Sequence, residues 1–93
     1  MDKIKFTDFV RQLSKKSGYA QRDIKEVLNI GSLCVAENLS DGIATTIMQG
    51  VVIYPGVYPA IDRIENGKHV HYDEVIYPRA RFGSAFKKQL LSS

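Results

Sequence analysis

Cysteine, tryptophan and long apolar stretches are almost missing from this chain of 93 residues. Cys34 is the only cysteine, and there is no tryptophan. A single cysteine cannot form an internal disulfide, which fits a reducing cytoplasm, and it gives no cysteine cluster for a metal ion. No apolar run reaches the roughly 18 residues of a transmembrane helix, and the N-terminus lacks an apolar signal segment. We therefore expect a cytoplasmic protein without membrane association.

Catalytic motifs are missing as well. The chain has no glycine-rich phosphate loop, and no histidine stands beside Cys34 in the sequence. His69 and His71 are two residues apart and share one face of a regular strand, but no third metal ligand is evident. We read them as an ordinary exposed strand face, with a metal-binding pair as the alternative. The sequence predicts no enzyme, no cofactor, no metal site and no small-molecule substrate.

The basic residues are concentrated at the two ends of the chain. Residues 1–22 hold six basic and two acidic residues, and residues 78–93 hold four basic residues and no acid. Residues 23–77 hold three basic and eight acidic residues. If the ends meet in space, they form one basic face, the electrostatic footprint of a surface for a polyanion. The alternative is a solvated surface with scattered charge.

Apolar spacing predicts two helices in the first half of the chain. Phe6, Phe9, Val10 and Leu13 form one stripe of a helix over about residues 3–16. Ser17-Gly18 ends that helix, with Gly18 available for a left-handed cap.

The second helix starts near residues 21–23 and ends at Asp41-Gly42. Ile30 and Cys34 widen its apolar side, which suggests a helix covered on two sides, as in a dimer. Gly31 in mid-helix costs about 1 kcal/mol relative to alanine, and close approach of another helix would compensate for it. The apolar stripe consists of Ile24, Val27, Leu28, Gly31, Val35 and Leu39.

From Ile43 onward, β-branched and aromatic residues predict strands. We interpret Pro55-Gly56 as a turn, residues 57–64 as a strand, and Asn66-Gly67 as a tight hairpin turn. Residues 69–77 form the returning strand, and Pro78 ends it or marks a sheet edge. The predicted sheet also contains a cluster of four tyrosines: Tyr54, Tyr58, Tyr72 and Tyr77. We read these tyrosines as half-buried sheet residues, with base stacking as the alternative.

A short helix over residues 84–91 closes the chain, with Ser84 as its cap and Gly83 before it. The order is two helices, a three-stranded meander and a terminal helix. This order is typical of an α+β fold with helices on one face of an antiparallel sheet.

This order and the local sequence resemble the HU/IHF family of bacterial histone-like DNA-binding proteins. The segment after Ser17-Gly18 is similar to the family's inter-helix segment, and the spacing from Gly18 to Gly42 matches its second helix. Residues 54–58 (Tyr-Pro-Gly-Val-Tyr) are similar to its Pro-Gly-Phe-Gly turn. Residues 81–90 resemble its closing Lys-Pro-Gly-Lys-x-Leu-Lys signature, with matches at Gly83, Phe86 and Lys87.

The chain departs from the family in its hairpin arm. Family arms are long and basic, with a tip of the form Arg-Asn-Pro-x-Thr-Gly whose proline wedges between base pairs. Here Asn66-Gly67 closes an arm about four to six residues shorter per strand, and residues 58–77 hold two basic and four acidic residues. Phe82 and Ser84 replace a family proline and lysine. About eight extra residues between Gly42 and Pro55 lengthen the first strand or add two helical turns.

The resemblance implies an α+β fold with two N-terminal helices, a three-stranded antiparallel sheet with a short hairpin arm, and a C-terminal helix. It also implies an intertwined dimer, either a homodimer or a heterodimer with an HU-like protein. We expect one domain over residues 1–93: a helical dimerisation part (1–42), the sheet and hairpin (43–78) and a basic C-terminal helix (79–93). The predicted dimer core consists of Phe6, Phe9, Leu13, Val27, Leu28, Gly31, Val35 and Leu39.

Double-stranded DNA is the implied partner, bound through phosphates with little sequence selectivity. We expect weaker bending than by the family's strong benders, because the intercalating wedge is missing, and a nucleoid-associated location. The predicted phosphate contacts are Lys3, Lys5, Arg63, Lys68, Arg79, Arg81, Lys87 and Lys88.

The acidic hairpin supports a second hypothesis. The chain would then be a protein-interaction or structural module that keeps the histone-like dimer and has lost its DNA-binding arm. It would act as a partner or inhibitor of a histone-like protein, or as a component of a phage particle.

Overall fold

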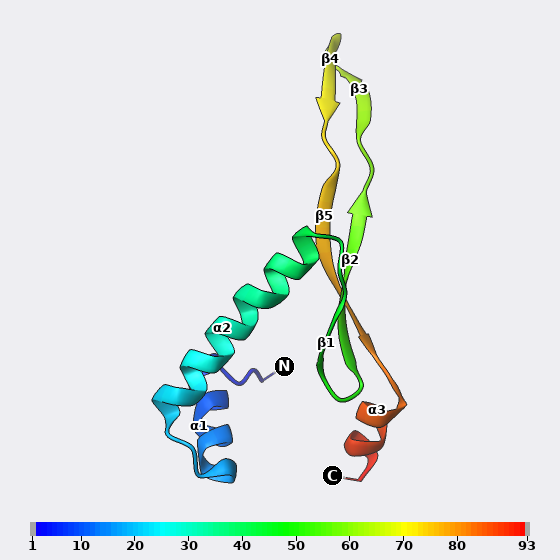
Figure 1. Ribbon diagram of the computed structural model, residues 1–93. Coiled ribbons are helices and arrows are strands. Elements are labelled where there is room, and N and C mark those ends of the chain that lie inside the picture. Colours follow the sequence, from blue (N-terminus) through cyan, green and yellow to red (C-terminus); the bar gives the residue numbers. More distant parts are fainter. Residues whose placement is uncertain (1, 93) are drawn as a thin grey trace. The chain divides into compact units, whose positions relative to one another are not determined.

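The computed structural model describes residues 2–92 and divides into two compact units, the first ending at Cys34 and the second beginning at Val35. Three helices and antiparallel sheets confirm the predicted α+β class (Figure 1). In chain order the elements are α1 (Phe6–Ser17), α2 (Gln21–Ser40), β1 (Thr45–Met48), β2 (Val51–Tyr58), β3 (Ile61–Glu65), β4 (Lys68–Tyr72), β5 (Val75–Phe82) and α3 (Ser84–Leu91).

Helix α1 begins three residues later than the expected boundary and ends as predicted. Lys5 is its extended N-cap, and Gly18 closes it in the left-handed conformation with φ 81°. The Gly18 amide donates to the Ser14 carbonyl over 2.8 Å, which is the capping bond that left-handed glycine allows. Of its apolar stripe, only Val10 is buried.

Helix α2 has the predicted extent and ends in a turn at Asp41-Gly42. The Gly42 and Ile43 amides donate to the carbonyls of Leu39 and Asn38, so the last turn of the helix is capped by backbone. The Asn38 side-chain amide also donates to the Thr45 hydroxyl over 2.9 Å and ties the helix end to β1.

The strands form a three-stranded sheet of order β1-β2-β5 and a separate hairpin of β3 and β4, so the predicted short hairpin arm is present. β2 pairs with β5 from Val51↔Phe82 to Tyr58↔Val75, and β3 pairs with β4 from Ile61↔Tyr72 to Glu65↔Lys68. In both ladders, the two residue numbers of every facing pair add up to the same value, so the register does not shift from one ladder to the other. The two pairs are therefore one two-stranded ribbon in constant register, interrupted at residues 59–60 and 73–74 (Figure 1).

The prediction of a turn at Pro55-Gly56 is wrong, and so is the part of the resemblance that placed a family turn there. Both residues lie inside β2, where Pro55 faces Pro78 and Gly56 faces Tyr77. Proline is tolerated here because β1 pairs only with residues 51–53 of β2. On the β1 side of Pro55 there is therefore no neighbouring strand to which a backbone amide would have to donate. Pro78 lies on the edge strand β5, which confirms the prediction that it marks a sheet edge and not the end of the strand.

The turn between the first two strands is at Gln49-Gly50, where Gly50 has φ 81°. The segment between Gly42 and Pro55 therefore consists of β1, this turn and the first half of β2, and the added helical turns do not exist.

Helix α3 has the predicted bounds, but its N-cap is Gly83 and not Ser84. The Gly83 amide donates to the Gly50 carbonyl over 2.7 Å, which holds Gly83 as the last extended residue and makes Ser84 the first helical one. A β-carbon at position 50 would lie 2.5 Å from the Phe86 backbone nitrogen. Gly50 therefore lets α3 pack directly on the β1–β2 turn, beside the tilted Phe82–Phe86 ring pair.

Candidate nucleic-acid interface

Strand alternation separates the two faces of the β2–β5 pair. One face is wholly apolar: Val51, Ile53, Pro55 and Val57 of β2 with Ile76, Pro78, Ala80 and Phe82 of β5. The other, which we name the arginine–tyrosine face, consists of Val52, Tyr54, Gly56 and Tyr58 of β2 with Val75, Tyr77, Arg79 and Arg81 of β5. The alternation thus gathers every cation of these two strands on one side.

Ring contacts order the arginine–tyrosine face. The Arg79 guanidinium carbon lies 5.2 Å from the centroid of the facing Tyr54 ring, within cation–π range. Tyr58 and Tyr77 are stacked with ring centroids 4.4 Å apart and an interplanar angle of 28°. Gly56 makes this possible, because a β-carbon there would overlap the Tyr77 ring and crowd the Arg79 side chain. The glycine thus leaves space for the ring to lie across β2.

Arg79 and Arg81 are exposed and have no carboxylate partner among residues 2–92. The two arginines that do form ion pairs are Arg11 with Asp8 at 2.9 Å and Arg22 with Asp23 at 4.0 Å, and neither was a predicted contact. All eight predicted phosphate contacts lack an ion pair within the described part of the chain. Their charges are therefore free to neutralise an external polyanion.

A groove lies where the ribbon is interrupted, between Tyr58 and Val75 of this face and side chains of the hairpin. Its volume is about 310 Å³, and it is lined by Tyr58, Ile61, Arg63, Tyr72, Asp73 and Val75. The Arg63 guanidinium carbon lies 5.9 Å from the Tyr72 ring centroid. The Tyr72 hydroxyl donates to the Glu65 carboxylate over 2.9 and 3.1 Å, which fixes the direction of the ring.

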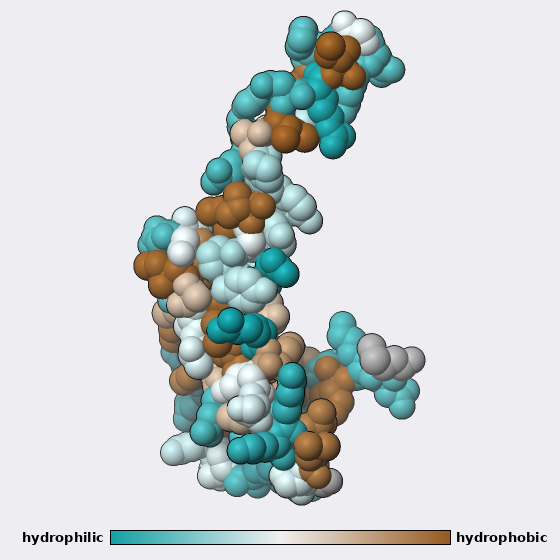
Figure 2. All heavy atoms as spheres, turned by 90° about the vertical axis from the view of Figure 1, so that its right-hand side faces the viewer, coloured by the Kyte–Doolittle hydropathy of each residue, from teal (hydrophilic) through white to brown (hydrophobic). Residues whose placement is uncertain are grey.

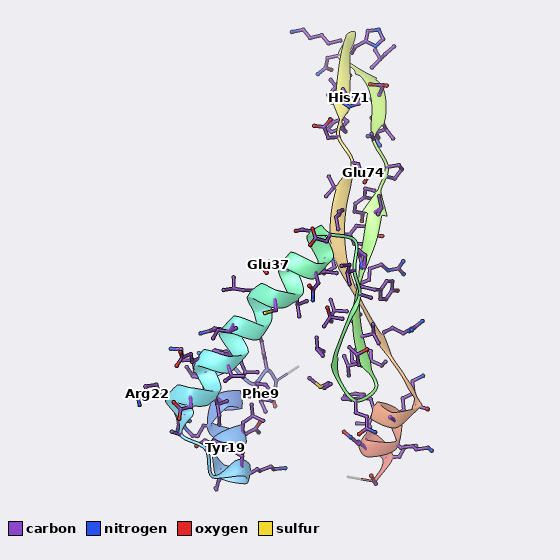
Figure 3. All side chains as sticks on the ribbon, viewed as in Figure 1. Phe9, Tyr19, Arg22, Glu37, His71 and Glu74 are labelled. Atoms are coloured by element: carbon purple, nitrogen blue, oxygen red, sulfur yellow. The ribbon has the colours of Figure 1, made fainter. Side chains whose placement is uncertain are left out.

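The hairpin also carries a histidine that lies between two carboxylates. His71 Nδ1 lies 2.7 Å from an Asp62 carboxylate oxygen, and its Nε2 lies 2.9 Å from one of Asp73 (Figure 3). Glu74 follows at the interruption of the ribbon (Figure 3). Among residues 2–92 no group of three or more histidine, cysteine or acidic side chains is arranged to hold a metal ion. Residues 58–77 hold four acidic and two basic residues, and hydrophilic and apolar side chains are mixed along the surface of this arm (Figure 2).

Comparison with solved structures finds 22 matching chains. One is the Anabaena HU–DNA cocrystal structure, which matches with a TM-score of 0.72 over 97% of this chain and 100% of that chain, at 13% sequence identity. The fold is HU-like. At this identity the likeness concerns the fold alone. No protein-family model and no curated protein sequence matches the chain.

The HU-like fold brings together only some of the predicted site residues. Arg79 and Arg81 share one face of β5, Arg63 lines the adjoining groove, and Lys68 begins β4 beside the hairpin turn. Lys87 and Lys88 lie on α3, whereas Lys3 and Lys5 precede α1 in the first unit. Convergence of the two chain ends on one face stays a prediction.

The residues that sequence reasoning placed apart from the site are the tyrosines. Their signal was present in the spacing: Tyr77, Arg79 and Arg81 are two residues apart, and so share a strand face. The mistaken turn at Pro55-Gly56 hid the corresponding relation between Tyr54 and Tyr58 on β2.

The predicted dimer-core residues lie on α1 and α2 and remain accessible in the single chain. Leu13, Leu28, Val35 and Leu39 are partly buried, whereas Phe6, Phe9, Val27 and Gly31 are exposed. No helix within residues 2–92 has the length and apolar character needed to cross a membrane.

Proposed function

We propose that this protein is an architectural, weakly sequence-selective duplex-DNA-binding protein that works as an HU-like dimer and not as an enzyme. The observation that carries the proposal is the arginine–tyrosine face, where unpaired Arg79 and Arg81 stand in a row with ordered tyrosines. Each cation that neutralises a phosphate releases counterions from the DNA, and an arginine without a carboxylate partner has no ion pair to break first. An HU-like fold, in a neighbour crystallised with DNA, agrees with this role.

Exposed apolar surface supports the dimer. Val10 and Val51 are the only buried apolar residues of the described chain, and Val27, Ile30 and Leu33 on α2 are each more than half exposed. Patches of this kind mark interaction surfaces in soluble proteins. A second HU-like chain that covers α2 would also explain Gly31, whose β-carbon would meet no neighbour within 4 Å in the single chain. The partner is a second copy or a related HU-like protein.

The hairpin predicts weak bending. Its tip is Asn66-Gly67, both with positive φ, in place of a proline wedge. Without an intercalating side chain at the tip, the protein has less means to kink a duplex. A nucleoid-associated location in the cytoplasm follows from this role, with a virion as the alternative site of action.

The deciding experiment is a salt titration of binding to random-sequence duplex DNA. We expect a steep negative slope of log affinity against log salt concentration. No measurable binding at low salt would exclude DNA as the partner.

The second candidate is a protein-interaction or structural module with an HU-like fold. It is favoured by the acidic side of the hairpin, where Asp62 and Asp73 flank His71. A module of this kind would form the dimer, or pair with an HU-like protein, and leave duplex DNA unbound throughout the titration. Size-exclusion chromatography with an HU-like partner then tests this candidate directly.

A further inference from the structure

The groove at the interruption of the ribbon adjoins the arginine–tyrosine face through Tyr58 and Val75 but differs from it in chemistry. Two aromatic rings, Tyr58 and Tyr72, and two aliphatic side chains, Ile61 and Val75, line it. Its volume of about 310 Å³ is at the lower end of small-ligand pockets, which run from roughly 300 to 1,000 Å³. The lining therefore suits a flat, uncharged ring.

The two tyrosines are held in place and remain accessible. Tyr58 is 61% exposed although its ring stacks on Tyr77, and Tyr72 is 43% exposed although Glu65 accepts from its hydroxyl. Ordered and exposed rings stack on a ligand with a smaller loss of side-chain entropy than mobile ones. In proteins that bind single strands, aromatic rings of this kind form the platforms on which bases stack.

The charges around the groove favour a base over a phosphate as its occupant. Arg63 lies against the Tyr72 ring, where it can hold a backbone phosphate beside the groove. Asp73 also lines the groove, and its exposed carboxylate would repel a phosphate placed inside but not a neutral base. Beyond Tyr77 the arginine–tyrosine face continues to Arg79 and Arg81, which extends the track for a backbone.

We propose that this groove is a nucleobase-stacking site, in which Tyr58 and Tyr72 receive an unpaired or extruded base of DNA bound along the arginine–tyrosine face. The inference rests on the proposed DNA-binding function and deepens it. The hairpin tip, Asn66-Gly67, has no apolar side chain that could wedge between bases. The proposal assigns the contact with bases to the two tyrosines at the base of the hairpin instead.

The test compares two DNA probes with the full-length protein. One probe is a fully paired duplex, and the other is the same duplex with a short single-stranded gap that carries 2-aminopurine. The variants are Tyr58→Leu/Tyr72→Leu and the single Tyr72→Leu, which leaves the Tyr58–Tyr77 stack in place. Controls are Tyr58→Phe/Tyr72→Phe, which keeps both rings, and Tyr19→Leu, an equally aromatic and 71% exposed position in the first unit.

We expect the double leucine variant to lose about tenfold in affinity for the gapped probe relative to the paired duplex. The phenylalanine variant and Tyr19→Leu should keep the wild-type ratio, and only proteins with both rings should quench 2-aminopurine. Leucine variants that bind both probes with the wild-type ratio would overturn the stacking site and leave the proposed function intact. Failure of the wild-type protein to bind either probe would refute both.

Discussion

Neutralising Arg79 and Arg81 tests whether the arginine–tyrosine face meets phosphates. Removing one protein–phosphate interaction reduces the slope of log affinity against log salt by about 0.9. If both arginines bind phosphates, Arg79→Gln/Arg81→Gln lowers the slope by about 1.8 for each chain on the duplex. Between about 50 and 200 mM salt, the affinity of the wild-type protein should then fall further than that of the variant, by about tenfold for each chain in contact with the duplex and about a hundredfold for a dimer that uses both. Fluorescence anisotropy with a labelled random duplex measures this slope.

The chain offers a control of equal charge. Arg11→Gln/Arg22→Gln also removes two positive charges, but these arginines are already ion-paired with Asp8 and Asp23. This control should keep a slope close to the wild-type value, since its arginines are less available to phosphates. Equal slopes for all three proteins would refute the placement of the site. An equal reduction of the slope in both variants would show that net charge alone, and not this face, drives binding.

Three further outcomes follow from single positions. The free energy of unfolding of Gly50→Ala should be about 1–3 kcal/mol lower than that of Gly67→Ala. Both glycines have positive φ, but only a β-carbon at position 50 would meet the backbone of α3. Equal denaturant midpoints of the two variants would contradict this. Gly56→Ala should change the near-ultraviolet circular dichroism of the tyrosines and weaken DNA binding, and unchanged spectra would mean that no ring had moved. Val27→Glu should shift the proposed dimer toward monomer in sedimentation velocity, while the exposed control Asn29→Glu should not; dissociation of both, or of neither, would remove Val27 from the proposed interface.

The helices could be predicted from the sequence because their signals are local. Apolar spacing and the left-handed glycine at position 18 fix α1, and the same kind of pattern fixes α2 and α3 to within a few residues. The hairpin turn at Asn66-Gly67 was equally readable, since both residues tolerate positive φ. In each case the contacts that determine the local structure are made by residues close together in the sequence.

The sheet register could not be read in this way, because it depends on pairing between distant segments. Pro55-Gly56 has the composition of a turn, yet Gly56 is needed in a strand, where a ring from the opposite strand covers it. The true turn at Gln49-Gly50 is selected by the packing of α3, which is more than thirty residues away. Local turn propensity was therefore overridden by tertiary contacts.

The corrected register decides which charges act together. In the sequence, Arg79 and Arg81 stand near Lys87 and Lys88, and all four belong to one basic C-terminal segment. In the fold, strand alternation joins the two arginines to tyrosines of β2, whereas α3 packs through Phe86 against Phe82, which lies on the apolar face. Counting charge along the chain therefore predicts a polyanion-binding tendency, and pairing across the ribbon selects the surface that we propose for it. Arg63 is linked to that surface by the groove that it lines together with Tyr58, although its own segment of sequence is acidic.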